Sequence, residues 1–593
     1  MKTYAEKLGG SKMSLYLIGG MFCLPFVIAY HDVPIPNFYN EWIAGLLGLL
    51  ALWPLITKPF WQSPTLPRSS FIFLVLLLLT YLQAMLIGAT APHLPLIQGY
   101  LIWGFLLTTL GYQLRQQHGW EAVSIVLAWS LLIGSAINGL FVVMQLLQHS
   151  GIVLPIPRLE SYGMLAQRNH FANFISLGIV SLMYLHAKRA IQNRWTVISL
   201  AMALVMLSFS GSRSAMLYLG AIALLCGLLH LTLQYQKRSI QTTERLLKIS
   251  LMLLPSFLML QLAMNSWLPE TFIQTPLTRA MDGISNPSAS LRLQFWQTSL
   301  ALFSQSPLLG MGVGQMRWQT YLLAATPSIN PSHMFFEHAH NLFLNLMAEM
   351  GLLGLLTALG GLLLWARAFF RHHVTTVETW WLLGCLGIIF IHSMVEYPLW
   401  YSYFLGIFAF LLGMGEASTV TLANFSQSAR KLLRLSLAGV LVYGLWQLAF
   451  MQIGYQKLEK QILFASQPEM SLAQKQDFVN KMLWVNQNTL LAPYAELVLA
   501  TYLAPNPTQA ELQRSIAENA IRFIPLRRPC LHFILLLELL EKHDQASAHL
   551  RRLLSVANGN LEQDIQQLPN QEARILREMV IQQKNADATA TAP

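Results

Sequence analysis

Charged residues are scarce in this 593-residue chain, where they make up only 11% of the sequence. A typical soluble domain contains about 25% charged residues, so this shortage excludes an ordinary soluble protein. Cysteine is scarce as well, and no two cysteines form a C-x-x-C pair. The spacing therefore indicates neither a disulfide framework nor a cysteine-based metal or redox site. The four cysteines are Cys23, Cys226, Cys385 and Cys530.

Hydrophobic residues are abundant instead, at 54%. Between Leu15 and Met451, apolar runs of roughly 18 to 22 residues recur, the length that crosses a bilayer about 30 Å thick. We predict an all-α polytopic membrane protein with about thirteen transmembrane helices. The first run has no clear A-x-A cleavage site and is followed by further spans, so we do not expect a removable signal peptide.

Basic residues predict the orientation of these spans. The segments on the N-terminal side of the membrane hold about three times as many Lys and Arg as the segments on the other side, and such an excess is typical of cytoplasmic loops. We therefore predict a cytoplasmic N-terminus and a C-terminal part on the outer side. The net charge of +11 then reflects cytoplasmic loops rather than binding to nucleic acid.

The chain changes character near residue 454, where it becomes polar. We predict a transmembrane domain over residues 1–453, which includes a long outer loop at 267–340. A helical domain would follow at 454–580, and its Pro-punctuated helix pairs are similar to a tetratricopeptide-type array. The last residues, 581–593, have the composition of a disordered tail.

The stretch "EHAHN" places titratable side chains at the head of an apolar helix. Asn341, Asn345 and Glu349 are four residues apart and form one polar stripe on that helix. His338 would extend the stripe only if the helix began early, whereas His340 points to a different face. If the helix begins near Asn341, the helix dipole favours a neutral His340 that can accept a proton. The alternative is that these residues only cap the helix and bond to neighbouring helices.

Further polar motifs lie on the same outer side. Arg213 in "SGSRSA" and Arg292 in "SLRLQFW" carry planar guanidinium groups that suit phosphate oxygens. Each could instead contact a lipid headgroup or pair with Glu349 or Glu396. His392 and Glu396 are four residues apart and would share a helix face, either around a proton or as a link between helices. The stretch "QRNH" adds Gln167, Arg168, Asn169 and His170 as supporting candidates.

Two common site patterns are absent. The glycines of "GMGVG" follow no strand of a βαβ unit, so they indicate a tight turn rather than a dinucleotide site. No metal-ligand spacing such as H-E-x-x-H occurs, and we expect no metal or other cofactor.

Together these motifs resemble the O-antigen ligase and polymerase (Wzy_C) superfamily. The similarity lies in "SGSRSA", in the run from Arg292 to "PLLGMGVG", and in "HAHNLFLNLMAEMGLLG". The stretches "QRNHFANF" and "HSMVEYPLWYSYF" resemble more narrowly the PglL-type protein O-oligosaccharyltransferases of Gram-negative bacteria. The resemblance covers about residues 1–580 and implies a GT-C-like transmembrane catalytic domain in the inner membrane, followed by a periplasmic helical domain.

The resemblance also implies a reaction. A glycan would move from undecaprenyl pyrophosphate to a Ser or Thr hydroxyl of a periplasmic protein, such as a type IV pilin. The essential histidine of the family falls on His340, although His338 remains possible, and the phosphate-side arginines fall on Arg213 and Arg292. One alternative is an O-antigen ligase or polymerase that uses a sugar hydroxyl, but the long C-terminal domain favours a protein acceptor. A membrane transporter is another alternative. The odd number of predicted spans disfavours it, as does the position of the polar groups on one face of the membrane rather than at its middle.

Overall fold

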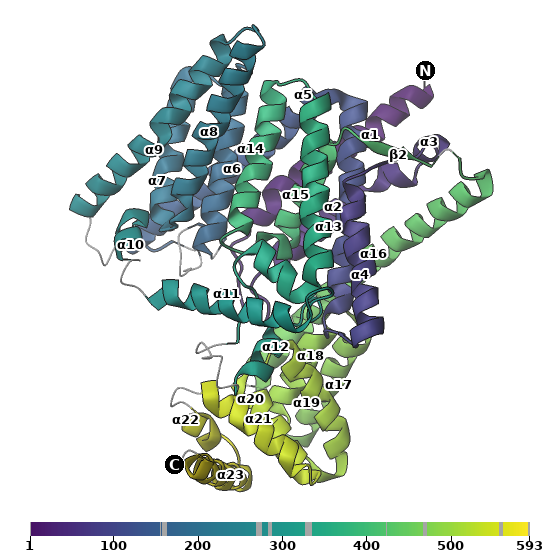
Figure 1. The fold of residues 1–593 in the computed structure, drawn as a ribbon, viewed down its shortest axis with the longest axis vertical. Coiled ribbons are helices and arrows are strands. Elements are labelled where there is room, and N and C mark those ends of the chain that lie inside the picture. The colour runs from purple at the N-terminus through teal and green to yellow at the C-terminus, as the bar shows by residue number, and fades with distance from the viewer. Residues whose placement is uncertain are drawn as a thin grey trace.

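The computed structural model is mostly helical and elongated (Figure 1). A large bundle of long helices forms one part, and shorter helices form a smaller part at one end, where the C-terminus lies. The N-terminus lies at the opposite end. The structure describes residues 2–154, 156, 163–165, 167–267, 275–282, 287–325, 335–422, 424–465, 471–556 and 561–590.

Ten helices of the described part are long and apolar enough to cross a membrane, which confirms a polytopic membrane protein. Two shorter apolar helices, α14 (Val377–Ser393) and α15 (Ser402–Met414), pack among them. The ten are α1 (Lys2–Cys23), α2 (Phe38–Ala51), α4 (Ser70–Ile87), α5 (Leu94–His149), α6 (Arg168–Ala187), α7 (Asn193–Ser210), α8 (Ser214–Tyr235), α9 (Gln241–Trp267), α13 (Leu342–His372) and α16 (Gln427–Ala465).

The difference from the predicted thirteen spans arises at three helices. Helix α5 has 56 residues and is interrupted at Gly119, whose φ of 80° and ψ of 168° are not helical. It is therefore two helices joined at a kink, in agreement with the two spans predicted there. Helices α14 and α15 have 17 and 13 residues, less than the usual length of a span.

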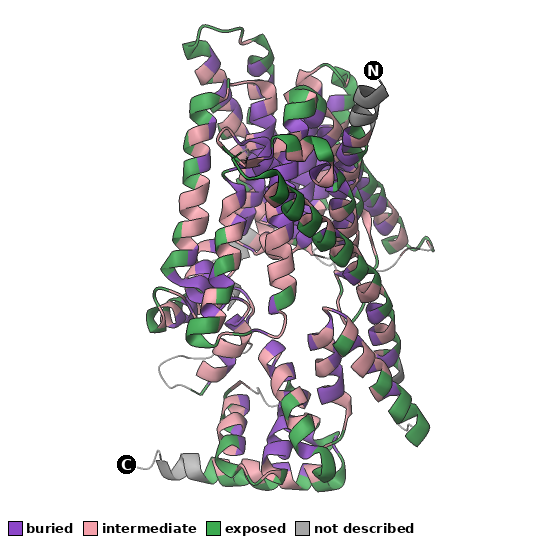
Figure 2. Cartoon of the chain, turned by 90° about the vertical axis from the view of Figure 1, so that its right-hand side faces the viewer, coloured by how far each residue is buried: buried purple, intermediate pink, exposed green. Residues whose placement is uncertain are grey.

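Buried residues are concentrated inside the large bundle (Figure 2), and α6 and α15 supply many of them. Every residue of α15 is buried, as are nearly all residues of α6. Helix α16, in contrast, exposes many apolar side chains along its length, among them Leu432, Val442 and Trp446. Lipid tails are as apolar as these side chains, so such exposure suits a helix at the rim of a membrane bundle.

The bundle contains little besides helices. Among the described residues, one small antiparallel sheet joins β1 (Thr65–Pro67) to β2 (Thr419–Thr421), with Leu66 opposite Val420. It lies at the end of the bundle away from the C-terminal helices (Figure 1).

The long loop predicted at 267–340 contains three helices. They are α10 (Pro276–Asp282), α11 (Pro287–Gln305) and α12 (Met316–Leu323). Helix α11 lies across the end of the bundle, close to the C-terminal helices (Figure 1). Residues 268–274, 283–286 and 326–334 of this loop lie outside the described part.

The C-terminal helices from α17 to α21 stack in chain order, each in contact with the next, and α22 and α23 pack against α20. They are α17 (Leu472–Asn488), α18 (Ala492–Tyr502), α19 (Ala510–Phe523), α20 (Arg527–Leu539), α21 (His543–Val556), α22 (Leu561–Gln566) and α23 (Asn570–Ala590). Helix α16 passes through residue 454 without a break, so the predicted domain boundary falls inside a helix. The tail predicted to be disordered is helical as far as Ala590, where alanines favour a helix. Residues 591–593 lie outside the described part.

Candidate active site

His340 lies directly before helix α13. The helix begins at Leu342, and the Asn341 side chain caps it by accepting hydrogen bonds from the backbone N–H groups of Phe343 and Leu344 at 3.1 and 3.2 Å. The expected helix start near Asn341 is therefore confirmed, and His338 is not part of the polar stripe. His340 has a left-handed backbone with φ of 51°. That conformation costs about 1–2 kcal/mol for a residue with a side chain and persists where the surroundings impose it, often at functional sites.

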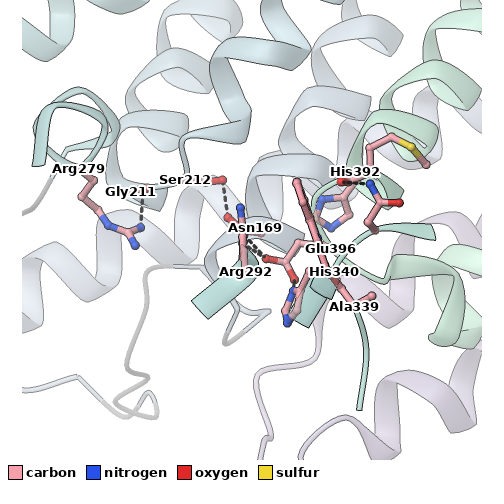
Figure 3. Close-up of polar contacts among 12 residues, drawn as sticks. Asn169, Gly211, Ser212, Arg279, Arg292, Ala339, His340, His392 and Glu396 are labelled. Carbon is pink, nitrogen blue, oxygen red and sulfur yellow. Dashed lines mark hydrogen bonds and ion pairs between the residues drawn. The ribbon is translucent and has the colours of Figure 1, made fainter. Parts of the chain in front are cut away.

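Glu396 lies at the centre of the polar cluster (Figure 3). Its Oε2 is 2.9 Å from Nδ1 of His340. Its Oε1 accepts a hydrogen bond from Asn169 Nδ2 at 2.6 Å and lies 3.4 Å from Nη2 of Arg292. Asn169 in turn accepts a hydrogen bond from the Ser212 hydroxyl at 2.6 Å. Side chains from three distant parts of the sequence therefore contact the Glu396 carboxylate, and Ser212 joins them through Asn169.

The contacts of Glu396 fix its charge. Burial alone would raise the pKa of Glu396, but the hydrogen bond from His340 and the nearby positive charges, including Arg292, outweigh burial and lower the pKa. The carboxylate therefore stays ionised. An ionised carboxylate only accepts hydrogen bonds, so Nδ1 of His340 carries a proton, and in the neutral imidazole Nε2 is the nitrogen that can accept one.

His338 has different surroundings from His340. Its ring packs against Tyr397 and Trp400, with ring centroids 4.1 and 5.0 Å apart. The side chain is only 5% exposed, against 26% for His340. Burial, followed by the charge of Arg317, lowers the pKa of His338 well below its usual value. A group with so low a pKa is a weak base near neutral pH.

Arg279 lies on the side of this cluster that holds Ser212 and Arg292 (Figure 3). Arg279 donates to the carbonyl oxygen of Gly211 at 2.7 Å. Burial, followed by the positive charges of Arg168, Arg213 and Arg292, lowers the pKa of Arg279, so each of these three guanidinium groups acts electrostatically on Arg279. Among the described residues, Arg168, Arg213 and Arg279 have no carboxylate partner. Unneutralised guanidinium groups of this kind are suited to a phosphate-containing anion.

Helix α11 supplies Arg292 and also holds the histidine loop. Arg292, Phe295 and Trp296 follow the i, i+3, i+4 spacing that places side chains on one helix face. The indole N–H of Trp296 donates to the carbonyl oxygen of Ala339 at 3.1 Å. The Phe295 ring is nearly parallel to the His340 ring, with centroids 5.9 Å apart. One helix face therefore fixes the spacing between the arginine and the histidine.

The polar stripe on α13 supports the histidine loop from inside the bundle. Asn345 accepts a hydrogen bond from the Ala339 N–H at 3.0 Å and donates to Glu349 Oε2 at 3.0 Å. Glu349 Oε1 accepts from the Gly314 N–H at 3.0 Å. These residues are buried, so their contribution is to hold two loops in place.

Helix α13 is broken at Gly351, where a continuous apolar helix was predicted. The φ of 63° and ψ of −162° at Gly351 interrupt the helical hydrogen bonds. The "GMGVG" turn fills the break, since Met311 N–H donates to Ala348 O at 2.8 Å and Gly312 N–H donates to Glu349 O at 3.0 Å. The three glycines of this turn have positive φ, so the predicted tight turn is confirmed.

Two candidate histidines lie deeper in the bundle. His392 Nδ1 is 2.8 Å from the Tyr218 hydroxyl, and His170 Nδ1 is 3.2 Å from the Tyr403 hydroxyl. Both histidines are buried. They form part of the packing behind Glu396 and do not contact His340.

The predicted shared helix face of His392 and Glu396 is wrong, because α14 ends at Ser393 and Glu396 lies in the turn that follows. Arg168 is exposed at the first position of α6, next to the arginine cluster. Gln167 precedes it, and its Oε1 is buried with no hydrogen-bond partner among the described residues.

Sequence analysis missed Arg279, Phe295 and Trp296. The signal for the two aromatic residues was their helical spacing from Arg292, but nothing in the sequence around Arg279 distinguished it.

The four cysteines are free and buried. In the part of the chain that the structure describes, no group of three or more His, Cys, Asp or Glu residues is arranged to hold a metal ion.

Three protein families match consecutive parts of the chain. The family described as "O-Antigen ligase" matches residues 197–359, which hold Arg213, Arg292 and His340. The family described as "Protein glycosylation ligase" matches residues 162–186, which hold Asn169. The family described as "Virulence factor membrane-bound polymerase, C-terminal" matches residues 380–563, which hold Glu396.

Two curated relatives from Acinetobacter baylyi are similar over most of the chain. A general O-oligosaccharyltransferase is 26% identical over 424 residues, which cover 68% of this chain and 70% of the relative. A ComP-specific O-oligosaccharyltransferase is 26% identical over 431 residues, which cover 70% of this chain and 74% of the relative.

Proposed function

Because this chain belongs to the O-antigen ligase family and is a glycosyltransferase, we propose that it transfers an oligosaccharide from undecaprenyl pyrophosphate to a protein. The acceptor atom is a Ser or Thr hydroxyl oxygen of a periplasmic protein, such as a type IV pilin. The observation that carries this function is the meeting of His340, Arg292 and Asn169 at Glu396.

His340 is the general base of the proposed reaction. A Ser or Thr hydroxyl is a poor nucleophile at neutral pH, and a positioned base accelerates its attack by about 10²–10⁴-fold. Glu396 holds Nδ1 of His340, so Nε2 takes the hydroxyl proton while the oxygen bonds to the anomeric carbon. The bond between that carbon and the pyrophosphate oxygen breaks, and the lipid pyrophosphate leaves as an anion.

The arginines stabilise the leaving group. Arg213 and Arg292 bind the pyrophosphate, and Arg279 and Arg168 add positive charge beside them. Guanidinium groups that are already in position stabilise charge that develops during the reaction. Since the arginines supply this charge, we propose that transfer needs no metal ion or other cofactor, and full activity in EDTA is the expected result.

The protein lies, in this proposal, in the bacterial inner membrane with a cytoplasmic N-terminus. The opposite positions of the N-terminus and the C-terminal helices support this orientation, as does the distribution of Lys and Arg. Counting α5 as two spans and α14 and α15 as one each gives about thirteen spans, the number predicted from the apolar runs. These spans would form a GT-C-like catalytic domain over residues 1–453. Residues 454–580 would form a tetratricopeptide-like periplasmic domain that selects the acceptor, and the contacts between consecutive helices from α17 to α21 support it.

An O-antigen polymerase or ligase is the second candidate. The match of residues 380–563 to a family of membrane-bound polymerases favours it. The same base and arginines would serve, but a sugar hydroxyl would be the acceptor. A transporter finds no support in the two relatives, which are both named as oligosaccharyltransferases.

The proposed function is tested by intact mass of a pilin co-expressed with this protein in a strain that makes the lipid-linked glycan. The expected result is a pilin heavier by one glycan only when the protein is present. An unmodified pilin, together with longer or newly ligated lipid-linked glycans, would assign the sugar-hydroxyl reaction instead.

A further inference from the structure

A cavity of about 480 Å³ lies where the membrane bundle meets the C-terminal helices. Its walls are the end of α4, the last turn of α11, the "GMGVG" turn, α12 and α19, which gather in the lower half of Figure 1. The volume is within the range of about 300–1,000 Å³ that is usual for ligand sites. We call it the junction groove, and its polar and aromatic lining includes Gln305, Ser306, Gln315, Trp318, Gln319 and Arg522.

Contacts between the two parts of the molecule hold this groove open. Arg522 of α19 donates to the carbonyl oxygen of Thr90, in the loop after α4, at 2.9 Å. The hydroxyl of Tyr321, on α12, lies 2.8 Å from Nδ1 of His549, on α21. Tyr321 is completely buried in the apolar core of the C-terminal helices. Met316, at the start of α12, packs in a cluster with Leu302 of α11 and Ala348 of α13. Helix α12 is thus fixed between the bundle and the C-terminal helices, and the groove is preformed.

The groove has the chemistry of a polypeptide site. Its three glutamine carboxamides both donate and accept hydrogen bonds, as peptide groups do. Trp318 adds an indole surface of the kind that dominates protein–protein contacts. Arg522 is the charged side chain of the lining, and its Nε is buried with no hydrogen-bond partner among the described residues. An extended segment that is neutral or acidic fits these groups.

The groove and the arginine cluster lie at opposite ends of α11. Arg292 is near the start of this helix and Gln305 is its last residue, so thirteen residues separate them by about 20 Å. Phe295 and Trp296, between these two points, contact the histidine loop. In a direct displacement the acceptor oxygen approaches the sugar from the face opposite the leaving group. An acceptor bound in the groove would therefore be separated from the arginines by the length of α11.

The distance from the groove to His340 suits a short piece of extended chain. The turn that lines the groove bonds to Glu349, which is eight residues after Asn341 and therefore about 12 Å along α13. Four residues of extended polypeptide span about 13 Å.

We propose that the junction groove binds an extended segment of the acceptor polypeptide about four residues from the Ser or Thr that meets His340. This inference rests on the proposed transfer to a protein. It makes the groove a specificity-determining surface that both the membrane bundle and the C-terminal helices build.

Steady-state kinetics with the purified full-length enzyme, the lipid-linked donor and the pilin test this assignment. The double variant Gln305→Ala/Gln319→Ala should raise the KM for pilin about tenfold and change the KM for the donor less than about twofold. Gln545→Ala, at an exposed glutamine of α21, is the matched control and should change neither constant. A rise in the donor KM alone would assign the groove to the glycan, and no change in either constant would also overturn the proposal. If the wild-type enzyme leaves the pilin unmodified, the proposed transfer to a protein is itself contradicted, and this result is obtained separately from the measurements on the variants.

Photo-cross-linking gives a second measurement that does not require loss of binding. The four native cysteines are buried, so a benzophenone maleimide should label Gln319→Cys selectively. Irradiation should link this variant to the pilin, and the Gln545→Cys control should give no such product. An active Gln319→Cys enzyme that forms no pilin adduct would contradict the proposal.

Discussion

Glu396 connects the two halves of the proposed chemistry. One oxygen orients the imidazole that takes the acceptor proton, and the other contacts Asn169 and Arg292 on the donor side. A buried carboxylate with these three partners is ionised, and its charge both fixes the His340 tautomer and attracts the Arg292 guanidinium. The charge of Glu396, more than its shape, should therefore determine activity.

Glu396→Gln tests this directly, because the carboxamide keeps the size of the side chain and removes its charge. We predict a fall in transfer of about 10²-fold or more, since the base is no longer held in the correct tautomer. The measurement is glycosylated pilin per unit of membrane-inserted enzyme. Glu511→Gln, on the exposed face of α19, is the control and should keep the wild-type rate. Near-wild-type transfer by Glu396→Gln would exclude a role for the charge.

The arginine cluster leads to a prediction about geometry as well as charge. Arg213→Lys, Arg279→Lys and Arg292→Lys should each lower transfer by about tenfold or more, because lysine keeps the charge but cannot form two parallel hydrogen bonds. Arg371→Lys, near the end of α13 remote from His340, should have no effect. Wild-type rates in all three cluster variants, at equal expression, would exclude recognition by the guanidinium groups.

At the scale of elements, α11 and α13 bring the reacting groups together. Helix α11 contributes Arg292 and clamps the loop through Trp296, and α13 supports the same loop through Asn345. The break at Gly351 leaves backbone carbonyls free to accept hydrogen bonds from the "GMGVG" turn. The position of His340 is therefore set by two helices and a turn rather than by its own loop.

Asn345→Ala should destabilise the protein without removing any reacting group. It leaves the Ala339 N–H without an acceptor, at a cost of about 1–3 kcal/mol, and removes one of the hydrogen bonds to the Glu349 carboxyl. We expect a lower melting temperature of the detergent-solubilised protein and less enzyme in the membrane. Leu363→Ala, at an exposed position of the same helix, should have little effect. An unchanged melting temperature for Asn345→Ala would show that these hydrogen bonds do not hold the loop.

The sequence was informative about helices and less informative about how they meet. Runs of apolar residues predicted the spans because a bilayer demands them, and Asn341 marked a helix start because its side chain can cap one. The break at Gly351 was missed because "EMGLLG" remains apolar and contains no proline. The hydrogen bond between Asn169 and Glu396, which are 227 residues apart, depends on tertiary packing. The local sequence could therefore indicate each residue as a candidate but could not predict that they contact each other. Arg279 was missed for the same reason.

At the scale of the whole molecule, the candidate active site and the C-terminal helices lie at the same end of the bundle (Figure 1). The N-terminus lies at the other end. A reaction that joins a membrane-embedded donor to a protein needs this arrangement, because the acceptor must reach the site from the aqueous side. The proposed periplasmic position of that end follows from the distribution of positive charge.

Reporter fusions test this orientation. A fusion at Glu511, on α19, should behave as exported, and a fusion at Arg371, near the far end of α13, should behave as cytoplasmic. The reason is that α13 crosses the membrane between its His340 end and its Arg371 end. Cytoplasmic behaviour at Glu511 would place the site on the wrong side for a periplasmic acceptor and would exclude the proposed reaction.

The role of His340 as the base is tested most directly by the intact mass of the pilin in cells that carry His340→Ala or His338→Ala. With both variants inserted in the membrane at wild-type amounts, we predict unmodified pilin for His340→Ala. For His338→Ala we predict substantial modification, because His338 is buried beside Tyr397 and Trp400 and does not contact Glu396. Wild-type amounts of modified pilin with His340→Ala would contradict the assignment of His340 as the base. Loss of pilin modification with His338→Ala alone would assign His338 as the base instead.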